Sequence, residues 1–75
     1  MNFQIYKLTN DKWNKIEIED VIKDDIIRVY DLDNKEYIEN SRGGITNICT
    51  KGVYKDKNNE LSINSEPYIL EKQYK

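Results

Sequence analysis

The sequence predicts an all-β fold, either a small barrel or a strongly bent antiparallel sheet of five to seven short strands with one helical turn. Residues 26–30 form the most apolar run of the chain, and their β-branched side chains favour a central strand. Residues 60–64 alternate between polar and apolar side chains, the period-two pattern of a strand with one solvent-exposed face. Clusters of Asn, Asp, Lys and Gly separate such runs and favour turns.

Residues 3–8 and 13–18 are predicted to pair as a hairpin, because a Thr-Asn-Asp-Lys turn cluster separates them. In the second strand Ile16 and Ile18 share one face, and Trp13 falls on the opposite parity. Trp13 is therefore expected either to cover the core from its edge or to stand exposed as a contact residue.

Residues 19–23 are predicted to form the helical turn, since the segment is short and begins with acidic residues. Val21 and Ile22 are expected to point inward and to close an open end of the sheet. Asp24 is expected to adopt a positive φ before the next strand, a conformation that Asp tolerates better than most residues.

The central hairpin is predicted to join a strand at 26–30 to a strand at 35–39 through an Asp-Leu-Asp-Asn turn. In the first of these strands Ile27 is expected to face the core. Arg28 and Tyr30 then share a different face from Ile27.

The remaining strands are expected at residues 45–50, 60–64 and 68–70. Gly52 is expected to break the chain after the first of them. Adjacent glycines in residues 40–44 predict a flexible loop.

Residues 1–75 are expected to form a single small domain with one small core, and the tail at 72–75 is expected to fray. The sequence has neither an apolar run of membrane-spanning length nor the pattern of a signal peptide, so a cytoplasmic protein is expected. The single cysteine, Cys49, is expected to be a small buried residue on a strand, and it cannot form an internal disulfide.

The net charge of −2 is distributed unevenly along the chain. Residues 17–39 contain nine acidic residues and three basic ones, a local net charge of −6, whereas residues 41–75 carry a net charge of +2. Phosphate backbones would be repelled by the first segment and only weakly attracted by the second, which disfavours nucleic acid as a partner.

Several kinds of chemistry are not predicted. The chain has no histidine, which is both the commonest general base and the commonest metal ligand. Asp31 and Asp33 begin like a calcium loop, but Lys35 and Glu36 occupy positions that need an oxygen ligand and a glycine. The sequence therefore predicts no catalytic residue, no metal and no cofactor, and it does not predict an enzyme.

Two stretches together, W-x-x-I-x-I-E-D-x-x-x-x-D-I-I-R-V-Y-D-x-D and L-S-I-N-S-E-P-Y, resemble a group of short uncharacterised proteins of phages and prophages of Gram-positive bacteria. The chain departs from that group at Asp24, where the group usually has Gly, and in the loop at 40–44. The resemblance implies a mobile-element origin and a β-rich fold, and it implies no catalytic residue.

Aromatic residues supply the first set of candidate binding residues. Small β-barrels bind ligands through exposed aromatic side chains, and Tyr, Trp and Arg supply most interface hot spots. The set comprises Trp13, Arg28, Tyr30 and Tyr37. The alternative is that these rings extend a core that is otherwise too small.

The acidic segment supplies the second set, Asp31, Asp33 and Glu36, which together with Glu39 are expected to crowd one end of the central hairpin. A patch of this kind would attract a partner with a basic surface, and replacing the three with neutral residues should weaken binding without disturbing the fold. The sequence therefore favours a non-enzymatic phage or prophage accessory protein that acts by protein–protein contact. A nucleic-acid-binding small β-barrel is the alternative.

Overall fold

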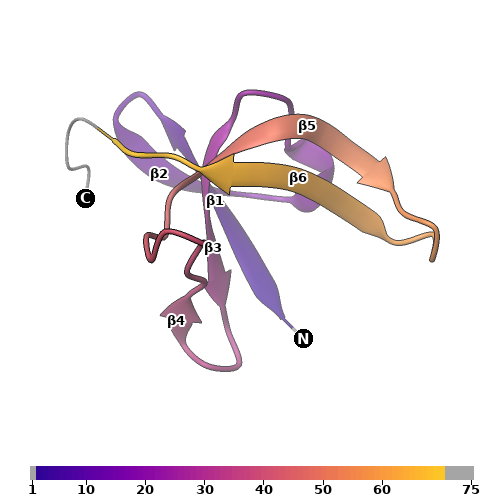
Figure 1. Ribbon diagram of the computed structural model, residues 1–75, viewed down its shortest axis with the longest axis horizontal. Coiled ribbons are helices and arrows are strands. Elements are labelled where there is room, and N and C mark those ends of the chain that lie inside the picture. The colour runs from indigo at the N-terminus through magenta and orange to yellow at the C-terminus, as the bar shows by residue number, and fades with distance from the viewer. Residues whose placement is uncertain (1, 71–75) are drawn as a thin grey trace.

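The computed structural model describes residues 2–70, and in this part of the chain it contains six strands and one 3-10 helix (Figure 1). The elements are β1 (Phe3–Thr9), β2 (Lys12–Ile16), η1 (Ile18–Asp20), β3 (Ile26–Asp31), β4 (Glu36–Tyr37), β5 (Asn47–Lys55) and β6 (Leu61–Pro67). All strand pairs are antiparallel, in the order β2-β1-β3-β5-β6, and β4 also pairs with β3. The all-β prediction is confirmed, and of its two forms the structure has the strongly bent open sheet rather than the closed barrel.

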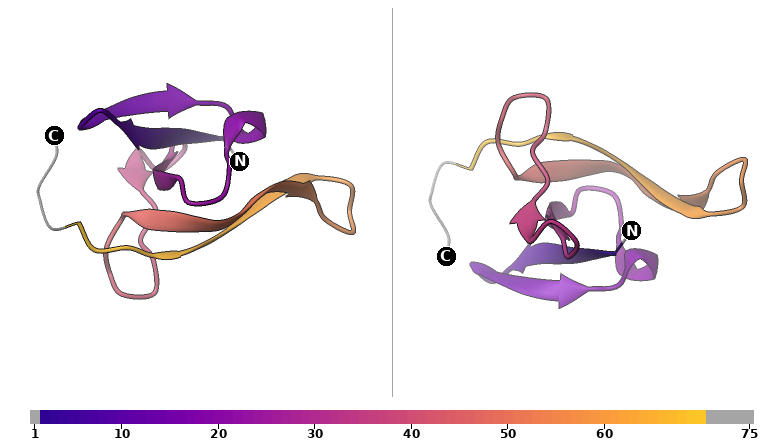
Figure 2. Two further views of the ribbon diagram at one scale, coloured as in Figure 1. Left: turned by 90° about the horizontal axis from the view of Figure 1, so that it is seen from above. Right: turned by 90° about the horizontal axis from the view of Figure 1, so that it is seen from below.

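The sheet bends so that the β1–β2 hairpin and the β5–β6 hairpin lie in two facing layers (Figure 2). The core lies on the inner side of this bend. Its buried members come from β1, the segment directly after η1, β3 and β5, and among the described residues they are Ile5, Val21, Ile27 and Cys49. Partly buried side chains packed against them are Ile16, Ile18, Val29 and Ile63. The predictions that Ile27 faces the core and that Cys49 is buried on a strand are both confirmed.

The first hairpin is confirmed, with Leu8 opposite Trp13 and Thr9 opposite Lys12. The two residues of its turn, Asn10 and Asp11, both have positive φ, 52° and 64°. Positive φ at both central residues is the requirement of the type I′ turn, whose twist matches that of the flanking strands.

The helical turn is a single 3-10 turn that begins one residue before the predicted segment. Val21 is 1% exposed and points inward as predicted, but Ile22 is 60% exposed, so that half of the prediction is wrong. The backbone N–H of Ile22 donates to the Asp25 carboxylate, and this bond turns the chain before Ile22 can enter the core. Asp24 has φ 73°, which confirms the expected positive φ.

Asp25 has a structural role that the sequence did not indicate. It is 6% exposed, and its carboxylate lies 3.0 Å from Lys7 Nζ on β1. Its carbonyl oxygen also accepts a hydrogen bond from the backbone N–H of Cys49. Burial, with a further contribution from the Asp25 charge, raises the pKa of the Cys49 thiol to about 11.

The strands of the second half differ most from the prediction. β4 has only two residues, because the chain leaves β3 after the Tyr30–Tyr37 pair and the other half of β3 pairs with β5. Gly52 does not end β5, which continues to Lys55 through two irregularities of register. There the backbone N–H of Val53 donates to the Val21 carbonyl, so β5 bends around the segment after η1.

The last predicted strand, residues 68–70, is absent. β6 instead continues through Pro67, which lies opposite the first residue of β5, Asn47. Beyond Asn47 the neighbouring strand has ended, so residues 68–70 have no strand to pair with.

Residues 40–44 form a loop organised by Asn40. Its side-chain oxygen accepts the backbone N–H groups of Arg42 and Gly44, and its side-chain nitrogen donates to the Thr46 carbonyl. The flexibility of this loop stays a prediction, and these bonds oppose it. The tail at 72–75, for which fraying was predicted, lies outside the described residues. Within residues 2–70 there is no helix with the length and apolar character needed to cross a membrane.

Candidate binding face

Strand alternation brings the predicted aromatic set to one side of the sheet. Ile5 and Ile27 point to the core, so Tyr6 on β1 and Arg28 on β3, which lie opposite each other, point away from it. Trp13 on β2 joins them through its pairing with Leu8, and Tyr37 on β4 through its pairing with Tyr30. We call this outer surface the aromatic face and define it by Tyr6, Trp13, Arg28, Tyr30 and Tyr37.

The side chains of the aromatic face contact one another. The rings of Tyr30 and Tyr37 meet edge to face, with centroids 5.1 Å apart and planes at 82°. Tyr6 meets Tyr37 in a similar way at 6.3 Å and 66°. The Tyr6 hydroxyl donates to Gln4 Oε1 at 2.8 Å, which holds its ring in place on the sheet. All five residues are partly exposed or, in the case of Tyr37, 36% exposed, so the face is accessible to a partner.

Arg28 lies over Trp13 with its Cζ atom 4.2 Å from the ring centroid, a cation–π contact between β3 and β2. Its Nε donates to Thr46 Oγ1 at 3.0 Å, which fixes the guanidinium plane. Among residues 2–70 its two terminal nitrogens have no hydrogen-bond or ion-pair partner. A positioned guanidinium with free donors can bind a carboxylate or a carbonyl oxygen.

Trp13 Nε1 is buried and has no hydrogen-bond acceptor within the described part of the chain. A buried donor without a partner costs about 1–3 kcal/mol. The Trp13 ring lies on the outer face and packs on Arg28 rather than on the core, and the side chain is only partly exposed. A role for Trp13 as a contact residue therefore stays a prediction.

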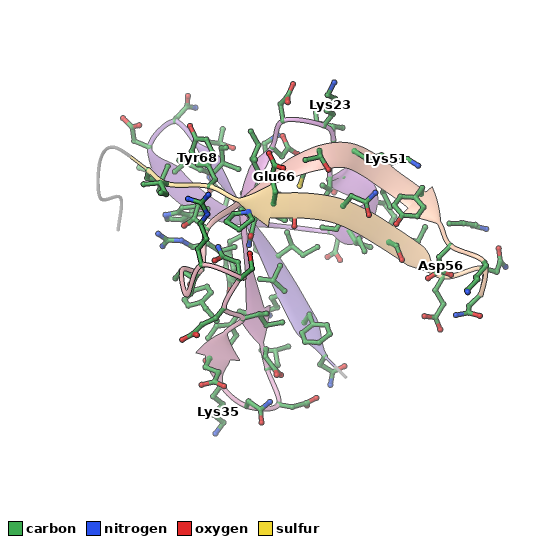
Figure 3. All side chains as sticks on the ribbon, viewed as in Figure 1. Lys23, Lys35, Lys51, Asp56, Glu66 and Tyr68 are labelled. Carbon is green, nitrogen blue, oxygen red and sulfur yellow. The ribbon has the colours of Figure 1, made fainter. Side chains whose placement is uncertain are left out.

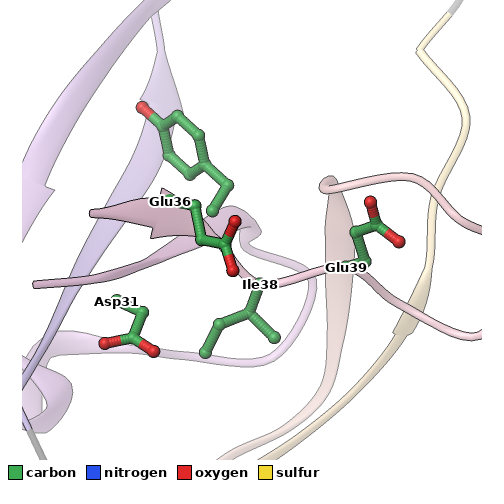
Figure 4. A pocket seen from close by; sticks show the side chains of 5 residues that line it. Asp31, Glu36, Ile38 and Glu39 are labelled. Atoms are coloured by element: carbon green, nitrogen blue, oxygen red, sulfur yellow. The ribbon is translucent and has the colours of Figure 1, made fainter. Parts of the chain in front are cut away.

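The acidic residues form a second region beside the aromatic face. A hollow of about 410 Å³ is lined by Asp31, Glu36, Tyr37, Ile38 and Glu39 (Figure 4). Part of the predicted acidic set thus converges. Glu39, which was expected at this end of the hairpin, also lines the hollow, whereas Asp33 does not line it but accepts a hydrogen bond from the Asn2 backbone.

Asp31 is tied to the fold. It is 9% exposed, and its carboxylate accepts hydrogen bonds from the backbone N–H groups of Asp33 and Asn34 and from the Asn34 side chain. Burial opposes ionisation of Asp31, but the bonds from Asn34 and Asp33 outweigh it and hold the pKa of the carboxyl below its ordinary value. Asp31 therefore closes the β3–β4 turn, and its substitution is expected to disturb the fold.

Sequence reasoning missed Tyr6, a member of the aromatic face, and also its neighbour Lys15. Both lie on the outer face, because Tyr6 is opposite Lys15 on one side and Arg28 on the other. The parity of Tyr6, opposite to that of Ile5, was a usable signal. The pairing of β1 with β3 could not be read from the sequence, because it depends on contacts between distant segments.

Three of the lysines lie on different parts of the molecule. Lys23 lies beyond η1, Lys35 at the tip of the β3–β4 turn and Lys51 on the β5–β6 hairpin (Figure 3). Within residues 2–70, no group of three or more His, Cys, Asp or Glu side chains could hold a metal ion.

Comparisons with protein-family models, with curated proteins and with solved structures give no match to this chain. The fold and the aromatic face together describe a small, bent, antiparallel β protein that presents three tyrosines, a tryptophan and an arginine on the outside of its sheet.

Proposed function

We propose that this chain is a non-enzymatic, cytoplasmic accessory protein of a phage or prophage that acts by binding a protein partner through the aromatic face. The single observation that carries the proposal is the gathering of Trp13, Arg28 and three tyrosines from four strands on one outer surface. These residue types dominate interface hot spots, and here they are preorganised by contacts with one another. The phage origin rests on the resemblance of the sequence motifs.

Photo-crosslinking in Gram-positive bacterial cells tests the proposal. A benzophenone amino acid at Tyr37, which is 36% exposed on the aromatic face, is expected to give a discrete crosslink to one protein. The matched control is the same amino acid at Leu61, which is 38% exposed but lies on β6. A crosslink of equal strength at Leu61, or none at Tyr37, would contradict the proposal.

A second candidate places the contact at the acidic hollow and pairs it with a basic surface. The convergence of Glu36 and Glu39 on one hollow favours it. Because Asp31 closes the turn, the test substitutes Asp33, Glu36 and Glu39 with their amides instead. Loss of the partner in this variant, and between 50 and 500 mM salt, would favour the hollow over the aromatic face.

Nucleic-acid binding is the alternative class and has less support. The tyrosine rings meet edge to face and Arg28 covers one side of Trp13, so these rings present few free faces on which bases could stack. The separation of Lys23, Lys35 and Lys51 also disfavours a continuous path for a phosphate backbone (Figure 3).

A further inference from the structure

Two cationic side chains, Lys15 and Arg28, lie close together on the outer side of the sheet, although the segment at 17–39 is strongly acidic. Tyr6 lies opposite Lys15 on β2 and opposite Arg28 on β3, so the three side chains form one row across the sheet. Neighbouring strands lie about 4.8 Å apart, which separates the Cα atoms of the two cations by about 10 Å. Lys15 and Arg28 thus flank an aromatic ring.

Neither cation has an anionic partner in the part of the chain that the structure describes, where the one ion pair joins Lys7 and Asp25. The paired positions on this face of β1, β2 and β3 carry no acidic side chain either. The row of Lys15, Tyr6 and Arg28 therefore carries two positive charges on a chain whose net charge is −2, and the acidic residue next along this side of the chain is Glu17, two residues after Lys15. Charge complementarity favours an anionic ligand.

We propose that the aromatic face binds an extended acidic segment of a partner protein, with one carboxylate on Arg28 and another on Lys15. The inference rests on the proposed function and adds the chemistry of the partner. An extended chain rises about 3.3 Å per residue, so acidic residues about two to four positions apart can reach both cations. An apolar or aromatic residue between them would lie on Tyr6.

A protein segment fits this surface better than a nucleic acid does. Glu36 and Glu39 border the hollow that Tyr37 also lines. A nucleic-acid chain that continued past Tyr37 would therefore bring its phosphates close to these carboxylates, which would repel them. A short acidic peptide can end before that point. Arg28, with its terminal nitrogens free and its plane fixed by Thr46, can take a carboxylate through two parallel hydrogen bonds.

Selection from a displayed library of random peptides of about ten residues tests the inference, with the whole chain as bait. We expect the enriched peptides to contain two acidic residues about two to four positions apart. Binding should fall about tenfold in Arg28→Gln and about threefold in Lys15→Gln, each the loss of one charge-assisted contact. The matched control, Lys57→Gln in the β5–β6 turn, should bind like the wild-type protein.

Trp13, the single tryptophan of the chain, reports where the selected peptides bind. We expect an enriched peptide to change its fluorescence emission, and the change to weaken in Arg28→Gln. Neutral or basic enriched peptides that still lose binding in Tyr37→Ala would overturn the acidic segment and leave the proposed function standing.

Two further outcomes would also contradict the inference. Peptides unaffected by any substitution on the face, or no enrichment at all, would count against both the acidic segment and the face itself. Tighter binding of an oligothymidylate of about ten nucleotides, lost in the same variants, would overturn the acidic segment in favour of single-stranded nucleic acid.

Discussion

The aromatic face and the acidic turn, residues 31–36, meet at β3 and use their charged groups in opposite ways. In the aromatic face, Arg28 is held by Trp13 and Thr46 while its terminal nitrogens stay free of partners within residues 2–70. In the acidic turn, the Asp31 carboxylate accepts three hydrogen bonds from Asp33 and Asn34 of the same turn. A charged residue near a candidate site can thus serve recognition or folding, and its internal hydrogen bonds distinguish the two roles.

The largest expected effect is the unfolding of the whole protein, which would abolish both the aromatic face and the acidic turn. Ile27 is fully buried in β3, which carries Arg28 and Asp31, and Ile27→Asp would place a charge in a core of four buried side chains. The cost is several kcal/mol against a total stability of about 5 kcal/mol, so we expect the variant to be unfolded. The buried Cys49 thiol, protected in the native protein, should then react at once with Ellman's reagent.

The control for this core substitution is Ile22→Asp, which introduces the same charge at a side chain that is 60% exposed. It should melt cooperatively and keep Cys49 protected. A soluble, cooperatively melting Ile27→Asp protein would show that the core has been misplaced.

The next largest effect is on thermal stability, and it concerns the acidic turn alone. Asp31→Ala removes three hydrogen bonds that close the β3–β4 turn and should lower the melting temperature by several degrees. Glu36→Ala, in the same turn and exposed, should leave the melting temperature unchanged. Equal thermal melting of the two variants would mean that Asp31 is as free as Glu36.

The dependence of stability on acidic pH gives a second test of the structural role of Asp31. Hydrogen bonds hold the pKa of Asp31, and of Asp56 through the backbone N–H of Glu60, below the ordinary value of 3.8. A lowered folded-state pKa means that the unfolded chain binds protons more readily, so this stabilisation is complete above about pH 4 and is lost as the pH falls through the folded-state pKa. Urea unfolding from about pH 5 to 2 should show a shallower decline for Asp31→Ala than for the wild-type protein.

Asp56 remains in both of those proteins, so some acid dependence should persist in Asp31→Ala. Parallel stability curves for Asp31→Ala and wild type over this pH range would argue that the Asp31 carboxylate gains nothing from its turn.

The smallest effect concerns the aromatic face. Arg28→Met keeps an unbranched side chain over Trp13 but removes the charge, and we expect it to lower the free energy of unfolding by about 0.5–1 kcal/mol. Arg42→Met, in the loop at 40–44, serves as the matched control with no expected change. Equal free energies of unfolding for Arg28→Met and Arg42→Met would show that the contact between Arg28 and Trp13 does not stabilise the fold.

The parts of the fold that depend on neighbours in the sequence could be predicted. The Thr-Asn-Asp-Lys turn, the positive φ of Asp24 and the inward side of Ile27 all follow from local conformational preference and from alternation. The errors lie where distant segments decide: Ile22 is turned outward by the Asp25 carboxylate, and residues 68–70 have no strand beside them.

The candidate site divides in the same way. The sequence by itself determined which residue types could bind and that Arg28 and Tyr30 share a face, because side chains alternate along a strand. Only the tertiary structure decided that β1 lies between β2 and β3, which brings Tyr6 and Lys15 to Arg28. It also decided that Asp31 belongs to its turn. Strand order and register are set by how the whole bent sheet buries Ile5, Val21, Ile27 and Cys49, and no local pattern contains that information.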